Sequence, residues 1–469
     1  MDGSYAITVN SMRSMNDRQK ERLILAAGIA LRLLYVLLST IYERQYDISE
    51  WDLSAGYAGG GGHLGYIHYL YEYGHLPDMN PATVYQFSHP PLHYALTALW
   101  LKGASIFVKD PAVLAESIQI LPLLYGIGIL VCFAKILDLT GLRGRGRSAA
   151  LLIIAFHPSL ILLSGSVNND ALALLLTLLT VYFLMRWARE RKMRTVLWLA
   201  LCLGLGIMTK LSVAEMLLPC GLVFLYVVYR ERKGAGHTKS GTGLKAYLAQ
   251  AAVFLGVSLP LGFWFYLRNY VVWKIPLTFV HDLGTDSWQY IGDVPLVNRY
   301  LFPVPSELFA NLRALRIGCG YNQWVQIMRT SVTGEWDMAG VPAAVKALAM
   351  LLMLTGAVLA VWALIAFVRL YVFGRGFAGV QADRVLFVSA YLTFFALYVK
   401  FSMDNPYQCS MDFRYIRPLL FLPAVALGLR LNGSGSRQGG TRLRDRVFWL
   451  ILTFFCVLSA AMTLAWGLL

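Results

Sequence analysis

The sequence predicts an all-α protein that crosses a membrane many times. Hydrophobic residues make up 57% of the 469 residues and charged residues only 14%, whereas soluble domains are about a quarter charged. Apolar runs of about 20 residues, long enough to cross a hydrocarbon core ~30 Å thick, recur along the chain. The placement of lysine and arginine gives these runs a consistent direction across the bilayer.

The apolar runs predict about eleven transmembrane helices within a single integral membrane module, residues 1–469. Two of them, on either side of Met208-Thr209-Lys210, are short and are joined by only a few residues. These two are therefore candidates for half-depth or re-entrant helices. In chain order the predicted spans are 22–40, 116–138, 148–164, 170–186, 195–209, 212–229, 247–267, 343–371, 385–401, 416–430 and 446–468.

Basic residues gather in alternate loops between the predicted spans. The positive-inside rule then places the N-terminus in the cytoplasm and the 41–115 segment outside a cell membrane. The net charge of +15 is dispersed over these loops, so binding to nucleic acid is not indicated. The basic groups are Arg13, Arg18 and Lys20; Arg143, Arg145 and Arg147; Arg189, Arg191, Lys192 and Arg194; Arg230, Arg232, Lys233 and Lys239; and Arg437, Arg442, Arg444 and Arg446.

Two large outer segments, 41–115 and 268–342, face short cytoplasmic turns, so a reaction site is expected on the outer face. The sequence contains no Gly-x-x-x-x-Gly-Lys-Ser/Thr pattern. The glycine run 59–62 follows no predicted strand and is interpreted as a linker. ATP is therefore not the expected donor. Cys319 and Cys409 both lie in outer segments, and a disulfide between them remains open.

The first outer segment predicts two helices along the membrane surface. Apolar residues recur at helical spacing over 63–73 and again over 93–106. Pro90-Pro91 is suited to the first turn of the second helix. Asp47 follows the first span by a few residues, which puts a carboxylate at the depth of lipid headgroups.

Several short stretches resemble glycosyltransferase family 39, which includes protein O-mannosyltransferases and lipid A aminoarabinose transferases. The resemblance implies a GT-C enzyme that moves a sugar from a polyprenyl phosphate to an acceptor on the outer face. The stretches, in order, are Asp47, the Gly-His-Leu-Gly-Tyr-Ile stretch that begins at Gly62, Leu76-Pro77-Asp78, His89-Pro90-Pro91-Leu92-His93-Tyr94, Asn168-Asn169-Asp170, Thr209-Lys210, Trp264 to Arg268-Asn269, and Phe413-Arg414-Tyr415.

The resemblance also implies which residue is catalytic. In the family an acidic residue of the first outer loop performs catalysis, and Asp47 is the matching position. Many relatives carry an adjacent Asp-Glu pair there. This chain has Asp47-Ile48, with Glu50 and Asp52 nearby, so the residue that supplies a second carboxylate remains open.

The reaction itself places demands on the residues. Inverting attack of a hydroxyl on an anomeric carbon needs a base and needs positive charge for the departing phosphate. Asp47 is the candidate base. Lys210, Arg268 and Arg414 lie at predicted outer ends of spans, where they can hold phosphate oxygens. Their structural alternative is snorkelling toward headgroups, and that of Asp47 is a solvated helix end.

The histidines and Asp170 have competing interpretations. His89 and His93, four residues apart, would chelate a divalent ion with His63 or Asp170 if they shared one helical face. Pro90 and Pro91 separate them, so supporting or substrate-binding roles for these residues and Asp52 are preferred, and no metal or other cofactor is expected. Asp170 is either a helix cap or, as in GT-C relatives, a second acidic site.

The predicted activity is transfer of a sugar from a polyprenyl-phosphate donor to a hydroxyl of a lipid, glycan or protein. The identities of the sugar and of the acceptor remain open. The alternative is a polytopic lipid or sugar transporter or flippase without transfer chemistry. A transporter places ionisable residues near the middle of spans and often has two related halves. Here the ionisable residues are expected at outer ends of spans, which favours the enzyme.

Overall fold

The computed structural model describes residues 15–41, 56–233, 243–306, 320–335, 338, 340–434 and 443–468. This part of the chain is helical and contains no strand. One isolated antiparallel bridge joins Tyr290 to Tyr407. The predicted all-α fold is confirmed for these residues.

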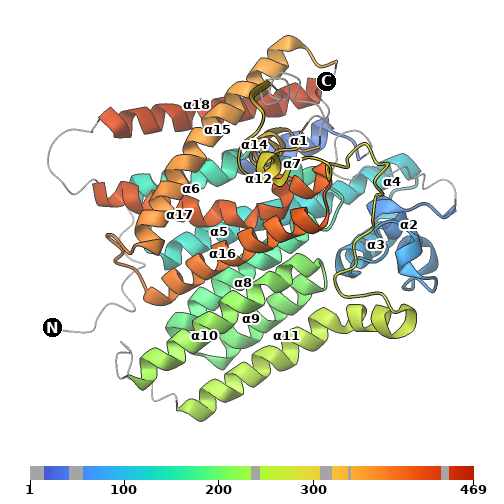
Figure 1. The fold of residues 1–469 in the computed structure, drawn as a ribbon, viewed down its shortest axis with the longest axis horizontal. Coiled ribbons are helices and arrows are strands. Elements are labelled where there is room, and N and C mark those ends of the chain that lie inside the picture. Colours follow the sequence, from blue (N-terminus) through green and yellow to red (C-terminus); the bar gives the residue numbers. More distant parts are fainter. Residues whose placement is uncertain are drawn as a thin grey trace.

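Long helices run side by side through the molecule (Figure 1). Each of the eleven predicted spans coincides with one of these helices or with two consecutive ones. They are α1 (Met15–Leu38), α5 (Ile120–Leu139), α6 (Gly144–Phe156), α7 (Pro158–Leu162), α8 (Asp170–Glu190), α9 (Met193–Ile207), α10 (Leu217–Arg232), α11 (Leu244–Trp273), α15 (Ala343–Phe367), α16 (Gln381–Asp404), α17 (Pro418–Ser434) and α18 (Leu443–Leu468).

Within the described residues, seven helical segments are long and apolar enough to cross a membrane, or eight if the bent pair of α6 with the segment 158–165 is one span. That pair bends by 56° at His157. Of the two short predicted spans, 195–209 corresponds to the 15-residue α9, whereas 212–229 belongs to a 22-residue segment, Leu211–Arg232. The chain is therefore a multi-pass membrane protein, and the number of about eleven crossings stays a prediction.

Short helices cover one end of the bundle. The helices α2 (Gly62–Tyr73) and α3 (Leu92–Ala104) match the two ranges where helices were predicted, and α3 begins directly after Pro91. Their position along a membrane surface stays a prediction. With α4 (Pro111–Glu116) they lie together at one end of the molecule (Figure 1). They share a small apolar core of their own, to which Ile41, Leu64, Tyr66, Phe87, Tyr94 and Leu101 contribute.

The second outer segment crosses the same end of the bundle. It contains α12 (Leu296–Tyr300) and α14 (Gln323–Thr333). His281 Nε2 lies 3.2 Å from the carbonyl oxygen of Val84, in the first outer segment. Ile291 N donates to Pro406 O over 2.9 Å, in the loop after α16. Hydrogen bonds thus attach the second outer segment both to the first outer segment and to the loop after α16.

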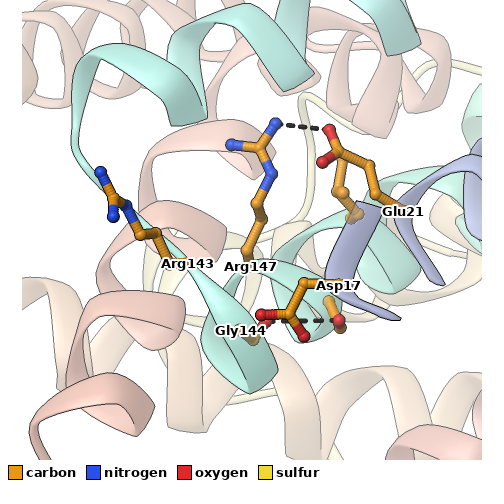
Figure 2. A pocket seen from close by; sticks show the side chains of 7 residues that line it. Asp17, Glu21, Arg143, Gly144 and Arg147 are labelled. Atoms are coloured by element: carbon orange, nitrogen blue, oxygen red, sulfur yellow. Dashed lines mark hydrogen bonds and ion pairs between the residues drawn. The ribbon is translucent and has the colours of Figure 1, made fainter. Parts of the chain in front are cut away.

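The opposite end carries the basic residues that predicted the cytoplasmic side, and acidic partners hold them in place. Arg147 lies 2.5 Å from Glu21 of α1 and 3.3 Å from Asp138 of α5. Figure 2 shows this ion pair in a small surface pocket, which Asp17 and Arg143 also line. The ion pairs Arg189–Asp383 and Arg191–Glu231, at 2.5 Å and 3.6 Å, join further helices there. Charge pairs at the helix ends therefore fix the bundle at this end.

Candidate functional site

The site is built around Asp170, the first residue of α8. Its side chain is 7% exposed. One carboxylate oxygen accepts a hydrogen bond from the Lys210 ammonium, and the other lies 3.3 Å from Arg417 Nη1. A buried carboxylate retains its charge when cations and hydrogen bonds of this kind replace water. Asn169, not Asp170, is the N-cap of α8, and no side-chain cap hydrogen bond forms there, so the helix-cap interpretation of Asp170 is wrong.

Two asparagines place Asp170 and Lys210 next to each other. Asn168 Oδ1 accepts a hydrogen bond of 3.0 Å from Asp170 N. Asn169 Nδ2 donates to Thr209 O over 2.8 Å and so attaches the loop before α8 to the loop after α9. Both asparagine side chains are buried. The Asn-Asn-Asp and Thr-Lys stretches, far apart in the sequence, therefore form one unit.

The histidine-containing stretch docks onto this unit. Leu92 N donates to Met208 O over 3.2 Å, and His93 Nε2 lies 2.8 Å from Val167 O. Complete burial lowers the pKa of His93 to about 4. The ring is therefore neutral near pH 7, with its proton on Nε2 donated to the Val167 carbonyl. His93 thus positions α3 against the second outer loop.

His63 and His89 lie beside each other under the surface helices. His63 Nδ1 is 2.7 Å from the Tyr94 hydroxyl, and its ring stacks on His89 at 5.8 Å. Because α3 begins at Leu92, His89 precedes it, and the helical spacing that a chelating pair with His93 requires is absent. The described residues contain no group of three His, Cys, Asp or Glu side chains placed to hold a metal ion.

Arg417, which the sequence analysis missed, is the second cation on Asp170. It is 1% exposed, and its Nε donates to Ser159 Oγ over 2.8 Å. It lies three residues after Arg414, in the turn before α17. Its spacing of one helical turn from Arg414, a predicted site residue, was the signal in the sequence that could have identified Arg417.

Arg414 lies on the neighbouring turn and faces Glu335. Its Nη1 is 3.4 Å from the Glu335 carboxylate. The ring of Tyr415 lies 5.1 Å from the Arg414 guanidinium and 5.2 Å from the Lys210 ammonium. Asp412 accepts a 2.6 Å hydrogen bond from Arg414 N, and burial raises the pKa of Asp412 against the opposing effect of Arg414 and Arg417. Lys210 and Arg414, both predicted to bind phosphate, thus contact the same aromatic ring.

Arg268 lies further away, near the end of α11. Its Nη2 donates to Pro77 O over 2.7 Å, and its guanidinium lies 4.7 Å from the centre of the Trp273 ring. Asp78, next to Pro77, accepts a 3.1 Å hydrogen bond from the Tyr69 hydroxyl. Arg268 therefore holds the Leu-Pro-Asp stretch of the first outer segment.

The predicted catalytic residue Asp47 and its neighbour Asp52 lie outside the described residues, as does Cys319. The roles of these residues stay predictions. The residues that flank the gap belong to the end that carries α2 and α3: Ile41 is in the small apolar core, and Tyr57 packs against it.

The fold is similar to that of a solved arabinofuranosyltransferase. Over 98% of this chain and 27% of the other, the structure resembles the arabinofuranosyltransferase AftD from Mycobacteria, with a TM-score of 0.50 and 13% identity. The chain therefore spans about a quarter of the length of that protein.

The family model that matches is described as dolichyl-phosphate-mannose-protein mannosyltransferase and covers residues 88–264. This range contains the histidine stretch, Asn168-Asn169-Asp170 and Lys210. The resemblance stated from the sequence is thus confirmed for that part of the chain. No curated protein sequence matches the chain.

Two further solved structures are similar at lower scores. The oligosaccharyltransferase of Archaeoglobus fulgidus is 13% identical, with a TM-score of 0.46 over 96% of this chain and 57% of the other. ArnT from Cupriavidus metallidurans is 16% identical, with a TM-score of 0.35 over 87% of this chain and 76% of the other.

Proposed function

We propose that the protein is a membrane glycosyltransferase that moves a sugar from a polyprenyl phosphate to an acceptor hydroxyl on the outer face. The observation that carries the proposal is the convergence of three matched stretches around Asp170. The histidine stretch, the Asn-Asn-Asp loop and the Thr-Lys loop all lie within residues 88–264, and hydrogen bonds join all three. The part that resembles mannosyltransferases thus supplies Asp170 and Lys210 of the charged cluster, and Arg417 joins it from outside that range.

The proposed reaction proceeds with inversion at the anomeric carbon. The acceptor oxygen forms a bond to that carbon while the bond from the carbon to the phosphate oxygen breaks. The acceptor proton passes to the carboxylate of Asp47, and the electron pair of the broken bond remains on the polyprenyl phosphate. A carboxylate is a suitable base for this step.

Positive charge is the second requirement, because negative charge develops on the departing phosphate. Lys210, Arg414 and Arg268 are the proposed phosphate ligands. Tyr415 brings Lys210 and Arg414 together. Asp170 holds Lys210 in place, so a cation at the membrane surface is fixed before the donor binds. Preorganised charge of this kind requires no reorganisation during the reaction.

The chemistry can be tested with one substitution and a matched control. We expect Asp47→Asn to abolish transfer of radiolabelled sugar from a polyprenyl phosphate in reconstituted membranes, with normal expression. Asp404→Asn, an exposed carboxylate paired with Lys400 at the end of α16, should leave transfer unchanged. Full transfer by the Asp47→Asn protein would refute the assignment of the base.

The acceptor can be identified by deleting the gene and finding which sugar modification is lost. Deletion of the gene should remove one sugar modification from the surface lipids, polymers or glycoproteins seen by mass spectrometry, and the lipid-linked donor should accumulate. An unmodified surface profile together with a donor retained on the cytoplasmic leaflet would favour a flippase instead.

A further inference from the structure

The helix break at His157-Pro158 exposes backbone carbonyls in the interior of the bundle. A proline has no N–H to bond the carbonyl four residues earlier, which here is Ile154, and its ring clashes with that carbonyl. The residue before a proline favours extended backbone, and His157 has φ −68° and ψ 121°. Within a bilayer each carbonyl freed in this way needs a new partner.

Side chains from two other helices bind these carbonyls. Arg32 of α1 donates to Ala155 O over 2.9 Å and to Ile154 O over 3.4 Å. Ser459 of α18 donates to Phe156 O over 2.5 Å. The three last carbonyls of α6 are thus all bound by side chains.

Arg32 is unusual for its position. It is 0% exposed and lies in the middle of the predicted span 22–40. Among the described residues no carboxylate forms an ion pair with it. The expectation that ionisable residues keep to the outer ends of spans is therefore wrong for this residue. A buried charge inside a span is costly and marks function by default.

The backbone of α1 is shaped to bring Arg32 to the break. A Cβ at Gly28 would lie 2.9 Å from the Ala155 Cβ, so glycine permits the close approach of α1 to α6. Arg32 Nη1 also donates to Gly28 O over 2.9 Å. The guanidinium therefore links the two helices where Gly28 lies close to Ala155.

On the far side of the break the chain leads directly to the cation cluster. Ser159, one residue after Pro158, accepts the hydrogen bond from Arg417 Nε, and Arg417 pairs with Asp170. In the other direction α1 ends at Leu38 and leads to Asp47. Arg32 thus lies between the helix that precedes the proposed base and the broken helix that supports the proposed phosphate ligands.

We propose that Arg32 is a positioning residue for sugar transfer, which fixes α1, and with it the start of the first outer segment, relative to Asp170 and Lys210. This inference rests on the proposed function. Arg32 acts through backbone carbonyls and touches no substrate. Its loss changes the distance between α1 and the Asp170–Lys210 pair without removing a reacting group.

The matched control is Arg147, a second buried arginine that binds α1 through Glu21 and α5 through the Ala134 carbonyl, at the opposite end. Both Arg32→Gln and Arg147→Gln should lower the unfolding temperature. Only Arg32→Gln should lower kcat in the folded fraction, by about ten- to a hundredfold as misplacement of reacting groups does, with the donor KM unchanged. Arg32→Lys should restore part of the loss.

A distance measurement makes the test independent of activity. Spin labels are placed at Leu37→Cys and Leu218→Cys, both exposed, in a protein with Cys319 and Cys409 changed to serine. The distance between the two labels reports the position of the end of α1 relative to the segment that follows Lys210. Arg32→Gln should shift or broaden the distance distribution, and Arg147→Gln should not. If Arg32→Gln does not fold, Gly28→Ala should cause the same shift.

The outcomes separate the two proposals. An Arg32→Gln protein with wild-type distances and a wild-type kcat overturns the positioning role, as does an equal kcat loss in Arg147→Gln. If the wild-type protein transfers no sugar, the proposed function fails. The distance distributions then still decide whether Arg32 holds the helices.

Discussion

Asp170 and Arg417 lie 247 positions apart in the sequence, yet the carboxylate of one is 3.3 Å from the guanidinium of the other. Both are buried, and Lys210 binds the second oxygen of the same carboxylate. One negative charge therefore compensates two cations. Its removal leaves the buried Arg417 and the half-buried Lys210 as two positive charges that repel each other.

This relationship predicts a loss of stability for Asp170→Asn. Breaking a buried ion pair from one side costs about 3–5 kcal/mol, so the free energy of unfolding should fall by that order in detergent or lipid discs. Asp404→Asn, an exposed pair with Lys400, should change it by less than about 1 kcal/mol. An Asp170→Asn protein as stable as the wild type would show that the pair contributes no net stability.

His93 predicts a pH dependence of stability. Its pKa falls from the ordinary 6.5 to about 4 in the folded protein because of burial, so the unfolded chain binds a proton at a higher pH than the folded one does. Stability should be complete above pH 6.5 and should decrease as the pH falls toward 4. The total loss is about 3 kcal/mol at 1.36 kcal/mol per pKa unit.

The His93 prediction is checked by unfolding the protein at a series of pH values. His93→Gln can still donate to Val167 O but does not titrate, so its stability should vary less between pH 6.5 and 4. His75→Gln, at an exposed histidine of the same outer segment, should follow the wild-type curve. Identical curves for the wild type and His93→Gln would contradict the assignment.

Arg268 predicts an effect on donor binding. A hydrogen bond to a charged group contributes about 1.5–3 kcal/mol, so Arg268→Gln should weaken the binding of a polyprenyl phosphate by about ten- to a hundredfold. The matched control is Arg384→Gln, because Arg384, like Arg268, donates to backbone carbonyls, here those of Tyr371 and Val372, but lies at the opposite end. Equal affinities for the wild type and Arg268→Gln would restrict Arg268 to holding Pro77.

The ion pair of Arg189 with Asp383, at the end of the bundle opposite the site, predicts a loss of stability without a loss of catalytic activity. Arg189 donates to both carboxylate oxygens of Asp383, which is 5% exposed. Arg189→Gln leaves that carboxylate buried without its cation and should destabilise the protein by about 3–5 kcal/mol. Sugar transfer by the folded fraction should keep its kcat. A reduced kcat at full folding would show that this end is coupled to the site.

The helices were predictable from the sequence because apolar runs are a direct consequence of the hydrocarbon environment. The helix starts in the first outer segment were predictable for a similarly local reason. Pro91 precedes α3 because proline suits a helix start, and the apolar spacing over 63–73 defines α2. The break at His157 was not recognised, although Pro158 was visible inside the predicted span 148–164.

The site was predictable only in part. The matched stretches named Asp170, Lys210 and Arg414, but which cation binds which carboxylate depends on contacts between residues far apart in the sequence. Arg417 and Arg32 were missed for this reason. Neither lies in the stretches that carry the resemblance, and Arg32 was hidden within an apolar span where a single charge was expected to be absent.

The docking of the histidine stretch and the Asn-Asn-Asp loop onto residues 208 and 209 uses main-chain oxygens as acceptors, those of Met208 and Thr209. Every amino acid supplies the same oxygen. Both hydrogen bonds can consequently form whichever side chains stand at positions 208 and 209, and mutations can accumulate at these two positions without loss of the fold. Chains that share as little as 13% of their residues can therefore retain a common scaffold.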